Sequence, residues 1–149
     1  MPKHILIPTD GSETAQKGVD YGLALARDLG AKVTVVTATD PYPMPVLALG
    51  AGWIPSEEEM NDYNAAQKAA ADKLLRAVKE AADKLGVHAA SVHVADIRPA
   101  DAILETARAR GAQLIVMASH GRRGVSRLVL GSQAAEVVAL ADVPVLVVK

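Results

Sequence analysis

Short apolar runs that suit buried strands alternate along the chain with segments of helical periodicity. The apolar runs occupy residues 3–10, 31–40, 88–96, 112–119 and 144–149. Runs of this length, rich in Val, Ile and Leu, are typical of strands buried on both faces of a sheet. Because every crossover between them is helical, we expect the α/β class: a five-stranded parallel sheet with helices on both faces.

Local signals mark the ends of the expected helices. Ser12 and Ser56 are suitable N-caps, and Glu59 completes a capping box with Ser56. Gly30 is the expected stop of the first helix, and Pro99 suits the first turn of a helix that Gly111 ends. The four expected helices lie within residues 12–30, 56–84, 99–111 and 132–141.

Residues 40–55 have a different character from the rest. They hold four of the eight prolines and the only tryptophan, so we expect a loop. Its apolar side chains could cover a ligand or pack on a partner; they are Met44, Val46, Leu47, Leu49, Trp53 and Ile54.

Composition limits the classes of function. The 149 residues suit a single domain spanning 1–149. A net charge of -1 gives no argument for nucleic-acid binding, and the absence of cysteine excludes a thiolate metal site or a cysteine nucleophile. No apolar run is long enough to span a membrane, so we expect a cytoplasmic protein without membrane insertion.

The stretch SHGRRGVSRLVLGSQ, residues 119–133, combines three glycines and three arginines with no acid. Glycines allow unusual backbone angles and close approach of a ligand. A helix that begins at Gly131 and Ser132 would present free amides and its dipole to an anion. Arg123 could face a phosphate, although a solvated arginine is an equal alternative. From spacing alone, phosphate binding and a flexible loop with a Gly-Ser helix cap are equal alternatives.

Three stretches, ILIPTDGSETA, LIVMASHG…LGS and VPVLVVK, make the chain resemble the universal stress protein family over its whole length. The nucleotide-binding branch of that family has a loop of the form G-x2-G-x9-G-[ST]. Gly121, nine residues and Gly131-Ser132 match it, while Ala118 replaces the first glycine. A left-handed backbone there would penalise alanine, whereas extended strand would tolerate it. We favour the extended form, because Ala118 directly follows the apolar run.

The resemblance implies a Rossmann-like fold of the adenine nucleotide alpha hydrolase-like type, with strand order 3-2-1-4-5. It further implies a regulatory or stress-sensing module that binds ATP, with ADP or AMP as alternatives and Mg²⁺ as a companion of the nucleotide. We expect at most slow hydrolysis, since no base or water-positioning residue is evident.

The resemblance also assigns roles to single residues. Asp10 would lie near the ribose or the adenine edge, with an Asp-Gly turn as the alternative reading of that residue. Pro8 and Thr9 would line the base pocket, and Ala38 would offer backbone groups to adenine. Ser132 and Gln133 would contribute to phosphate binding, Gln133 through its backbone amide.

The closing strand is expected at a sheet edge, where unpaired backbone groups invite pairing. The resemblance implies a homodimer through Val143 to Val148, with the two copies antiparallel; an edge covered within the monomer is the alternative. Two other functions stay open: a protein-interaction module without nucleotide, and a weak nucleotide hydrolase. A triad of Ser12, Asp10 and His120 is disfavoured, because no GxSxG-like elbow is present.

Overall fold

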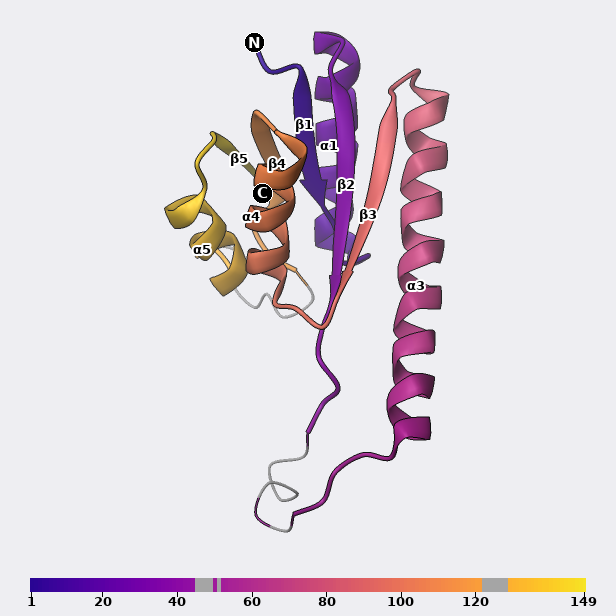
Figure 1. Ribbon diagram of the computed structural model, residues 1–149. Coiled ribbons are helices and arrows are strands. Elements are labelled where there is room, and N and C mark those ends of the chain that lie inside the picture. Colours follow the sequence, from indigo (N-terminus) through magenta and orange to yellow (C-terminus); the bar gives the residue numbers. More distant parts are fainter. Residues whose placement is uncertain (45–49, 51, 122–128) are drawn as a thin grey trace.

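Strands and helices alternate as predicted in the computed structural model, which describes residues 1–44, 50, 52–121 and 129–149 (Figure 1). The strands are β1 His4–Pro8, β2 Lys32–Thr39, β3 Ala89–Ala95, β4 Leu114–Ala118 and β5 Val145–Val148. The helices are α1 Glu13–Leu29, α3 Glu57–Lys84, α4 Pro99–Arg110 and α5 Ser132–Leu140. Part of the proline-rich segment, including Val46, Leu47 and Leu49, lies outside the described residues.

The five strands form one parallel sheet in the order β3-β2-β1-β4-β5, which confirms the predicted order. The chain winds outward from β1 to β3 and then returns to place β4 on the other side of β1. The loops that follow β1 and β4 therefore leave neighbouring strands at a topological switch point, where sheets of this class bind ligands.

Helices cover both faces of the sheet. Ile5 and Ile7 of β1 pack in the core under α1 and α3, whereas Leu6, between them, packs in the core under α4 and α5. None of the three side chains has exposed surface. This burial explains why the strand reads as a continuous apolar run and not as an alternating one.

The predicted capping signals are confirmed. Ser12 and Ser56 accept hydrogen bonds from the first turns of α1 and α3, and Glu59 completes the capping box by accepting from the Ser56 N–H at 2.7 Å. Gly30 and Gly111 end α1 and α4 in the left-handed conformation, with φ of 61° and 64°. Both glycines satisfy carbonyls of the last turn through their N–H groups.

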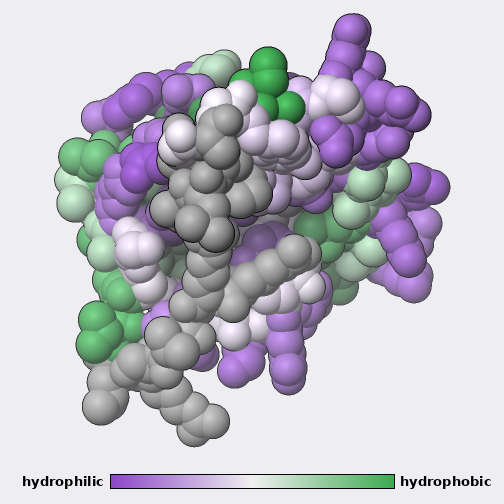
Figure 2. Space-filling model, turned by 90° about the horizontal axis from the view of Figure 1, so that it is seen from below, coloured by the Kyte–Doolittle hydropathy of each residue, from purple (hydrophilic) through white to green (hydrophobic). Residues whose placement is uncertain are grey.

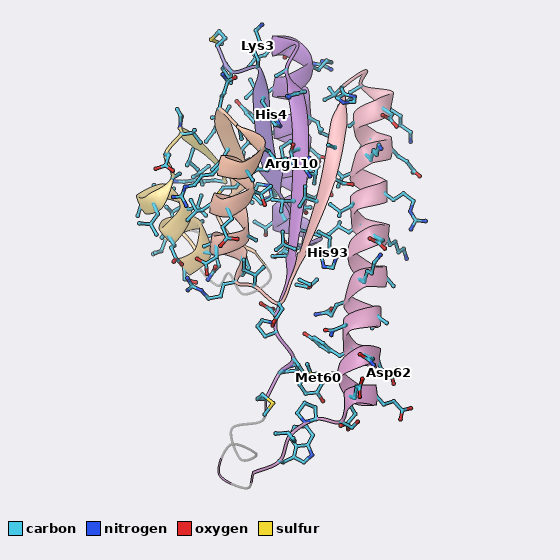
Figure 3. The ribbon with its side chains drawn as sticks, viewed as in Figure 1. Lys3, His4, Met60, Asp62, His93 and Arg110 are labelled. Carbon is cyan, nitrogen blue, oxygen red and sulfur yellow. The ribbon has the colours of Figure 1, made fainter. Side chains whose placement is uncertain are left out.

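The first turns of α3 extend beyond the ends of the strands. Buried side chains of this helix begin at Ala71, and Met60 and Asp62 lie on the projecting part (Figure 3). The Tyr63 hydroxyl donates to the carbonyl of Asp40 at 3.1 Å, which ties the segment after β2 to this helix. Among the described residues, no helix is both long and apolar enough to cross a membrane.

The start of α4 is held by side chains that sequence patterns do not reveal. Its N-cap, Arg98, makes no side-chain capping bond, and Pro99 takes the first position. The Gln133 Oε1 of α5 instead accepts from the Ala100 N–H at 2.9 Å. Arg98 also pairs with Glu136 of α5 at 2.8 Å, on the surface. Helix α5 therefore supplies the cap of α4.

His4 is buried at the opposite end of β1 from the switch point (Figure 3). Its Nε2 lies 2.8 Å from the Thr34 hydroxyl of β2. Burial lowers the pKa of His4 below its ordinary 6.5, and the charge of Lys32 lowers it further. A hydrogen bond with the backbone of Arg110 opposes this lowering of the pKa without reversing it.

We predict that acidification destabilises the protein in part through His4. With a folded pKa below 6.5, the unfolded chain binds a proton before the folded chain does. The contribution of neutral His4 is therefore complete above about pH 6.5 and is lost as the pH falls toward the folded pKa. Melting temperatures measured between pH 7.5 and 5.5 should fall less in His4→Gln than in the wild type. Parallel curves would contradict this role.

We also predict that Gln133→Ala lowers the free energy of unfolding by about 1 kcal/mol, because it removes the cap of α4. The melting temperature should fall by about 2–4 °C. Gln16→Ala on α1 is the matched control. The hydrogen bond described for the Gln16 side chain joins it to Asp20 on the exposed surface of the same helix. That variant should lose less than about 0.5 kcal/mol. Equal losses in the two variants would refute the capping role.

Candidate functional site

Most of the predicted site residues meet at one end of the sheet, which we call the carboxyl end. Pro8, Thr9 and Asp10 end β1 or follow it, Ala38 lies near the end of β2, and Ala118 ends β4. Figure 2 views the molecule from this end; hydrophobic residues show on the left, the side of α5 and β5 in Figure 1, and also at the top and right of the centre. Parallel pairing brings these segments together, because all strands end at the same side.

Asp10 organises the turn that leads into α1. Its Oδ1 accepts from the Ser12 N–H at 2.9 Å, and Gly11 adopts a φ of 79°. Buried Thr9 contributes a second bond, since its hydroxyl accepts from the Gly11 N–H at 3.2 Å. The Thr9 N–H itself donates to the Val36 carbonyl of β2 at 2.9 Å. The Asp-Gly turn considered for Asp10 is thus present.

The second carboxylate oxygen of Asp10 faces Gly121. A methyl group built on Gly121 would lie 2.5 Å from Oδ2 of Asp10. The segments after β1 and β4 therefore meet here, although more than 100 residues separate them. Any side chain at position 121 would displace the carboxylate.

Ala118 is the last residue of β4 and pairs with Val148 of β5. Its backbone is extended, and Asp96 is the one non-glycine residue with positive φ in the described ranges. The expectation that alanine replaces glycine within extended strand is confirmed. No backbone strain arises from this replacement.

Ser119 joins the edge strand to the start of α5 through its backbone. Its N–H donates to the Val148 carbonyl at 2.9 Å, and its carbonyl accepts from the Gly131 N–H at 2.9 Å. Sequence reasoning missed this junction, because backbone hydrogen bonds leave no residue signature.

The expected reason for the glycines needs a correction. Gly131 has a φ of -57°, and Gly121 is not among the glycines with positive φ. A methyl group on Gly131 would instead lie 3.2 Å from the Ser119 carbonyl oxygen. Both glycines thus permit close approach of one chain segment to another and do not supply unusual backbone angles; Gly124 lies outside the described residues.

The N-terminus of α5 differs from those of the other described helices. Its first turn holds no acid, whereas α1, α3 and α4 each carry at least one there. The cap is Gly131, and Ser132 is the first helical residue. The first amides of a helix have no partner within it, and the dipole makes that end positive. The arrangement can attract an anion, and the side chain of Gln133 is turned to α4.

Arg123, the arginine considered for a phosphate contact, lies outside the described residues, as do Arg122 and Arg127. The Ser12 hydroxyl accepts from the Ala15 N–H, and His120 Nδ1 lies 2.9 Å from the Ser119 hydroxyl. These partners differ from those of the disfavoured triad. Within residues 1–44, 50, 52–121 and 129–149, no group of three or more His, Asp or Glu could hold a metal ion.

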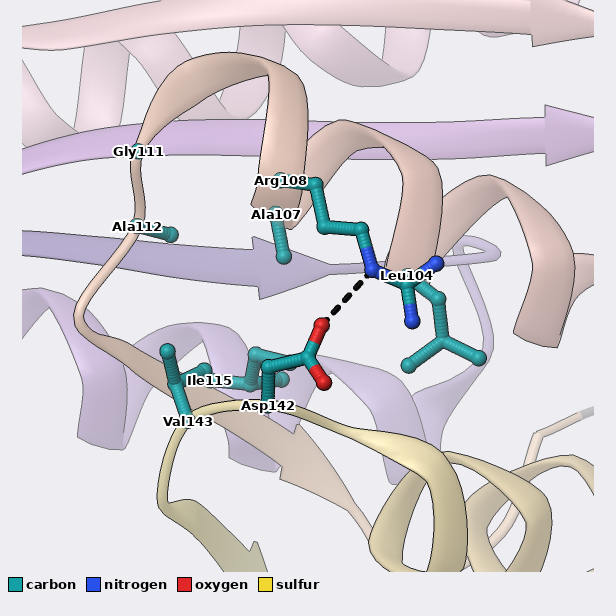
Figure 4. A pocket seen from close by; sticks show the side chains of 8 residues that line it. All are labelled: Leu104, Ala107, Arg108, Gly111, Ala112, Ile115, Asp142 and Val143. Carbon is teal, nitrogen blue, oxygen red and sulfur yellow. Dashed lines mark hydrogen bonds and ion pairs between the residues drawn. The ribbon is translucent and has the colours of Figure 1, made fainter.

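Two surface hollows lie away from the turn that Asp10 forms after β1. The first, of about 200 Å³, lies between the end of α4 and the segment before β5, where Arg108 and Asp142 pair at 2.7 Å (Figure 4). It is smaller than most ligand pockets. The second, of about 300 Å³, lies beside β5 and extends to Ser119 and His120. Neither contains Asp10 or Ala38.

Comparison with known proteins gives one consistent result. The model of the universal stress protein family matches residues 1–149. A universal stress protein of Thermus aquaticus is 37% identical, with complete coverage of both chains. Universal stress protein MJ0531 of Methanocaldococcus jannaschii is 33% identical, over 99% of this chain and 82% of that protein.

Solved structures agree with this result. The protein MJ0577 has a TM-score of 0.81 at 27% identity, covering 99% of this chain and 95% of that one. A universal stress protein solved in complex with cAMP has a TM-score of 0.72 at 25% identity, covering 99% and 97%. With the parallel sheet in the expected order and a family match from end to end, the chain belongs to the universal stress protein family.

Proposed function

We propose that the protein binds an adenine nucleotide at the carboxyl end of the sheet and acts as a regulatory or stress-sensing module. ATP is the expected ligand, with ADP or AMP as alternatives, Mg²⁺ as its companion and at most slow hydrolysis. One observation carries the proposal: the acid-free N-terminus of α5 is hydrogen-bonded to the segment after β4, and that segment reaches Asp10 at the switch point.

The proposed site divides into a nucleoside part and a phosphate part. Pro8, Thr9 and the backbone of Ala38 would contact adenine, and Asp10 would accept from ribose hydroxyls. The phosphates would lie against the amides at the start of α5, where the dipole favours negative charge. The phosphate part would comprise Ala118, Gly121, Gly131, Ser132 and the Gln133 amide, with Arg123 as an added charge.

Family membership supports this assignment, since one relative was solved with cAMP. The first test is to denature purified protein and identify any released nucleotide by chromatography and mass. Near-stoichiometric ATP or ADP would support the proposal. An empty extract, followed by no calorimetric binding of ATP with Mg²⁺, would favour a protein-interaction module of the same fold.

The phosphate part predicts an unusual split between binding and stability. Ser132→Asp places a negative charge at the N-terminus of α5, where it should stabilise the helix by about 0.3–1 kcal/mol. The same charge should repel the phosphates and weaken ATP binding at least about tenfold, roughly 1.4 kcal/mol. Calorimetry and thermal melting measure the two effects, with Ser132→Asn as the neutral control. If Ser132→Asp binds ATP as tightly as the wild type, the phosphates do not bind at the N-terminus of α5.

We further propose a homodimer through residues Val143 to Val148. Strand β5 lies at the edge of the sheet, and its four side chains are only partly buried. The carbonyls of Pro144 and Val148 accept from β4, so the alternate positions Val145 and Val147 turn backbone groups to the open edge. Exposed Val138 of α5 lines a hollow together with Val145 and Val147 and extends this apolar surface.

The dimer can be tested at one backbone group. Val147→Pro removes an N–H from the open edge and should weaken self-association at least about fivefold in sedimentation equilibrium. Leu85→Lys is the control, because Leu85 is an exposed apolar residue at the end of α3, just before β3 at the opposite edge of the sheet, and should leave the mass unchanged. A wild-type monomer at all concentrations would exclude this interface.

A further inference from the structure

Gly18 of α1 lies directly against the backbone at the end of β4. A methyl group built on Gly18 would lie 2.8 Å from the nitrogen of Ala118 and 3.2 Å from the carbonyl carbon of Met117. Glycine is a poor residue for the interior of a helix, yet Gly18 lies in the interior of α1, where it is buried. Its presence here is explained by the closeness of the two backbones.

The methyl group of Ala118 points to the same side of the sheet as Gly18. Side chains alternate along a strand, so Ala118 shares the face of Val116. Val116 packs in the core with α1, and its Cγ1 would lie 3.4 Å from a methyl group on Gly22, one turn after Gly18. The Ala118 side chain therefore lies on the α1 face of the sheet, but the atoms nearest to Gly18 are backbone atoms of Met117 and Ala118.

This contact lies between two segments of the proposed nucleotide site: the Asp10 turn is the first half, and the segment after β4 is the second. Helix α1 begins at the turn that Asp10 and Ser12 build, and Ala118 is followed by Ser119, which holds Gly131. A shift of α1 away from β4 would move the first half, and a shift of Ala118 would move the second.

We propose that Gly18 is a positioning residue for nucleotide binding, because it lets α1 lie directly against the backbone at Ala118. This contact sets the spacing between the Asp10 turn and the segment after β4, and the inference rests on the proposed nucleotide function.

The test compares two alanine substitutions in one helix. Gly18→Ala would press on backbone atoms, which cannot rotate away. Gly22→Ala, the matched control, would meet Cδ1 of Ile7 at 2.6 Å, the mobile end of a side chain. Both add one methyl group to the buried face of α1. Affinity for ATP with Mg²⁺ is measured by calorimetry at a temperature where every variant is folded, so that stability does not enter.

We expect Gly18→Ala to bind ATP roughly tenfold more weakly and Gly22→Ala to stay within about twofold of the wild type. Ala118→Gly should not restore the affinity of Gly18→Ala, because the backbone atoms that the added methyl group meets stay in place.

The outcomes separate the two proposals. Absence of binding in the wild type overturns the nucleotide function itself. If the wild type binds, equal affinities in Gly18→Ala and Gly22→Ala overturn the positioning role alone. If Gly18→Ala does not fold although Gly22→Ala does, Gly18 is required for folding itself, and the positioning role is overturned as well.

Discussion

Ile5, Leu6 and Ile7 of the central strand have no exposed surface, although successive side chains of a strand point to opposite faces. Both faces of β1 must therefore be covered by helices. Each such side chain contributes about 1.5–3 kcal/mol when it leaves water. Parallel strands on both sides of β1 are the arrangement that crossover helices allow, and the rest of the sheet follows from it.

The same constraint creates the site. Since β2 and β4 flank β1, the segments that leave β1 and β4 start side by side, and helices on opposite faces follow them. Asp10 then reaches Gly121, and Ser119 holds the start of α5. The proposed nucleotide site is thus a consequence of strand order, with α1 carrying one half and α5 the other.

Local signals in the sequence were reliable where the interaction itself is local. Ser12, the capping box of Ser56 and Glu59, and the stop at Gly30 act within four residues, so their effect can be read from the chain. Glycines were harder to interpret. Gly30 does adopt a left-handed conformation, but Gly131 serves close approach to Ser119, and nothing nearby in sequence distinguishes the two cases.

The sequence by itself determined the order of elements, the parallel sheet and the segments that approach the switch point, because hydrophobic periodicity and capping are short-range. Only the tertiary structure decided which residues that are distant in sequence touch one another: Gln133 with the start of α4, Gly18 with Ala118, and Gly121 with Asp10. Such contacts depend on the distance between packed backbones. That distance is set by the whole core, and no single segment of the chain records it.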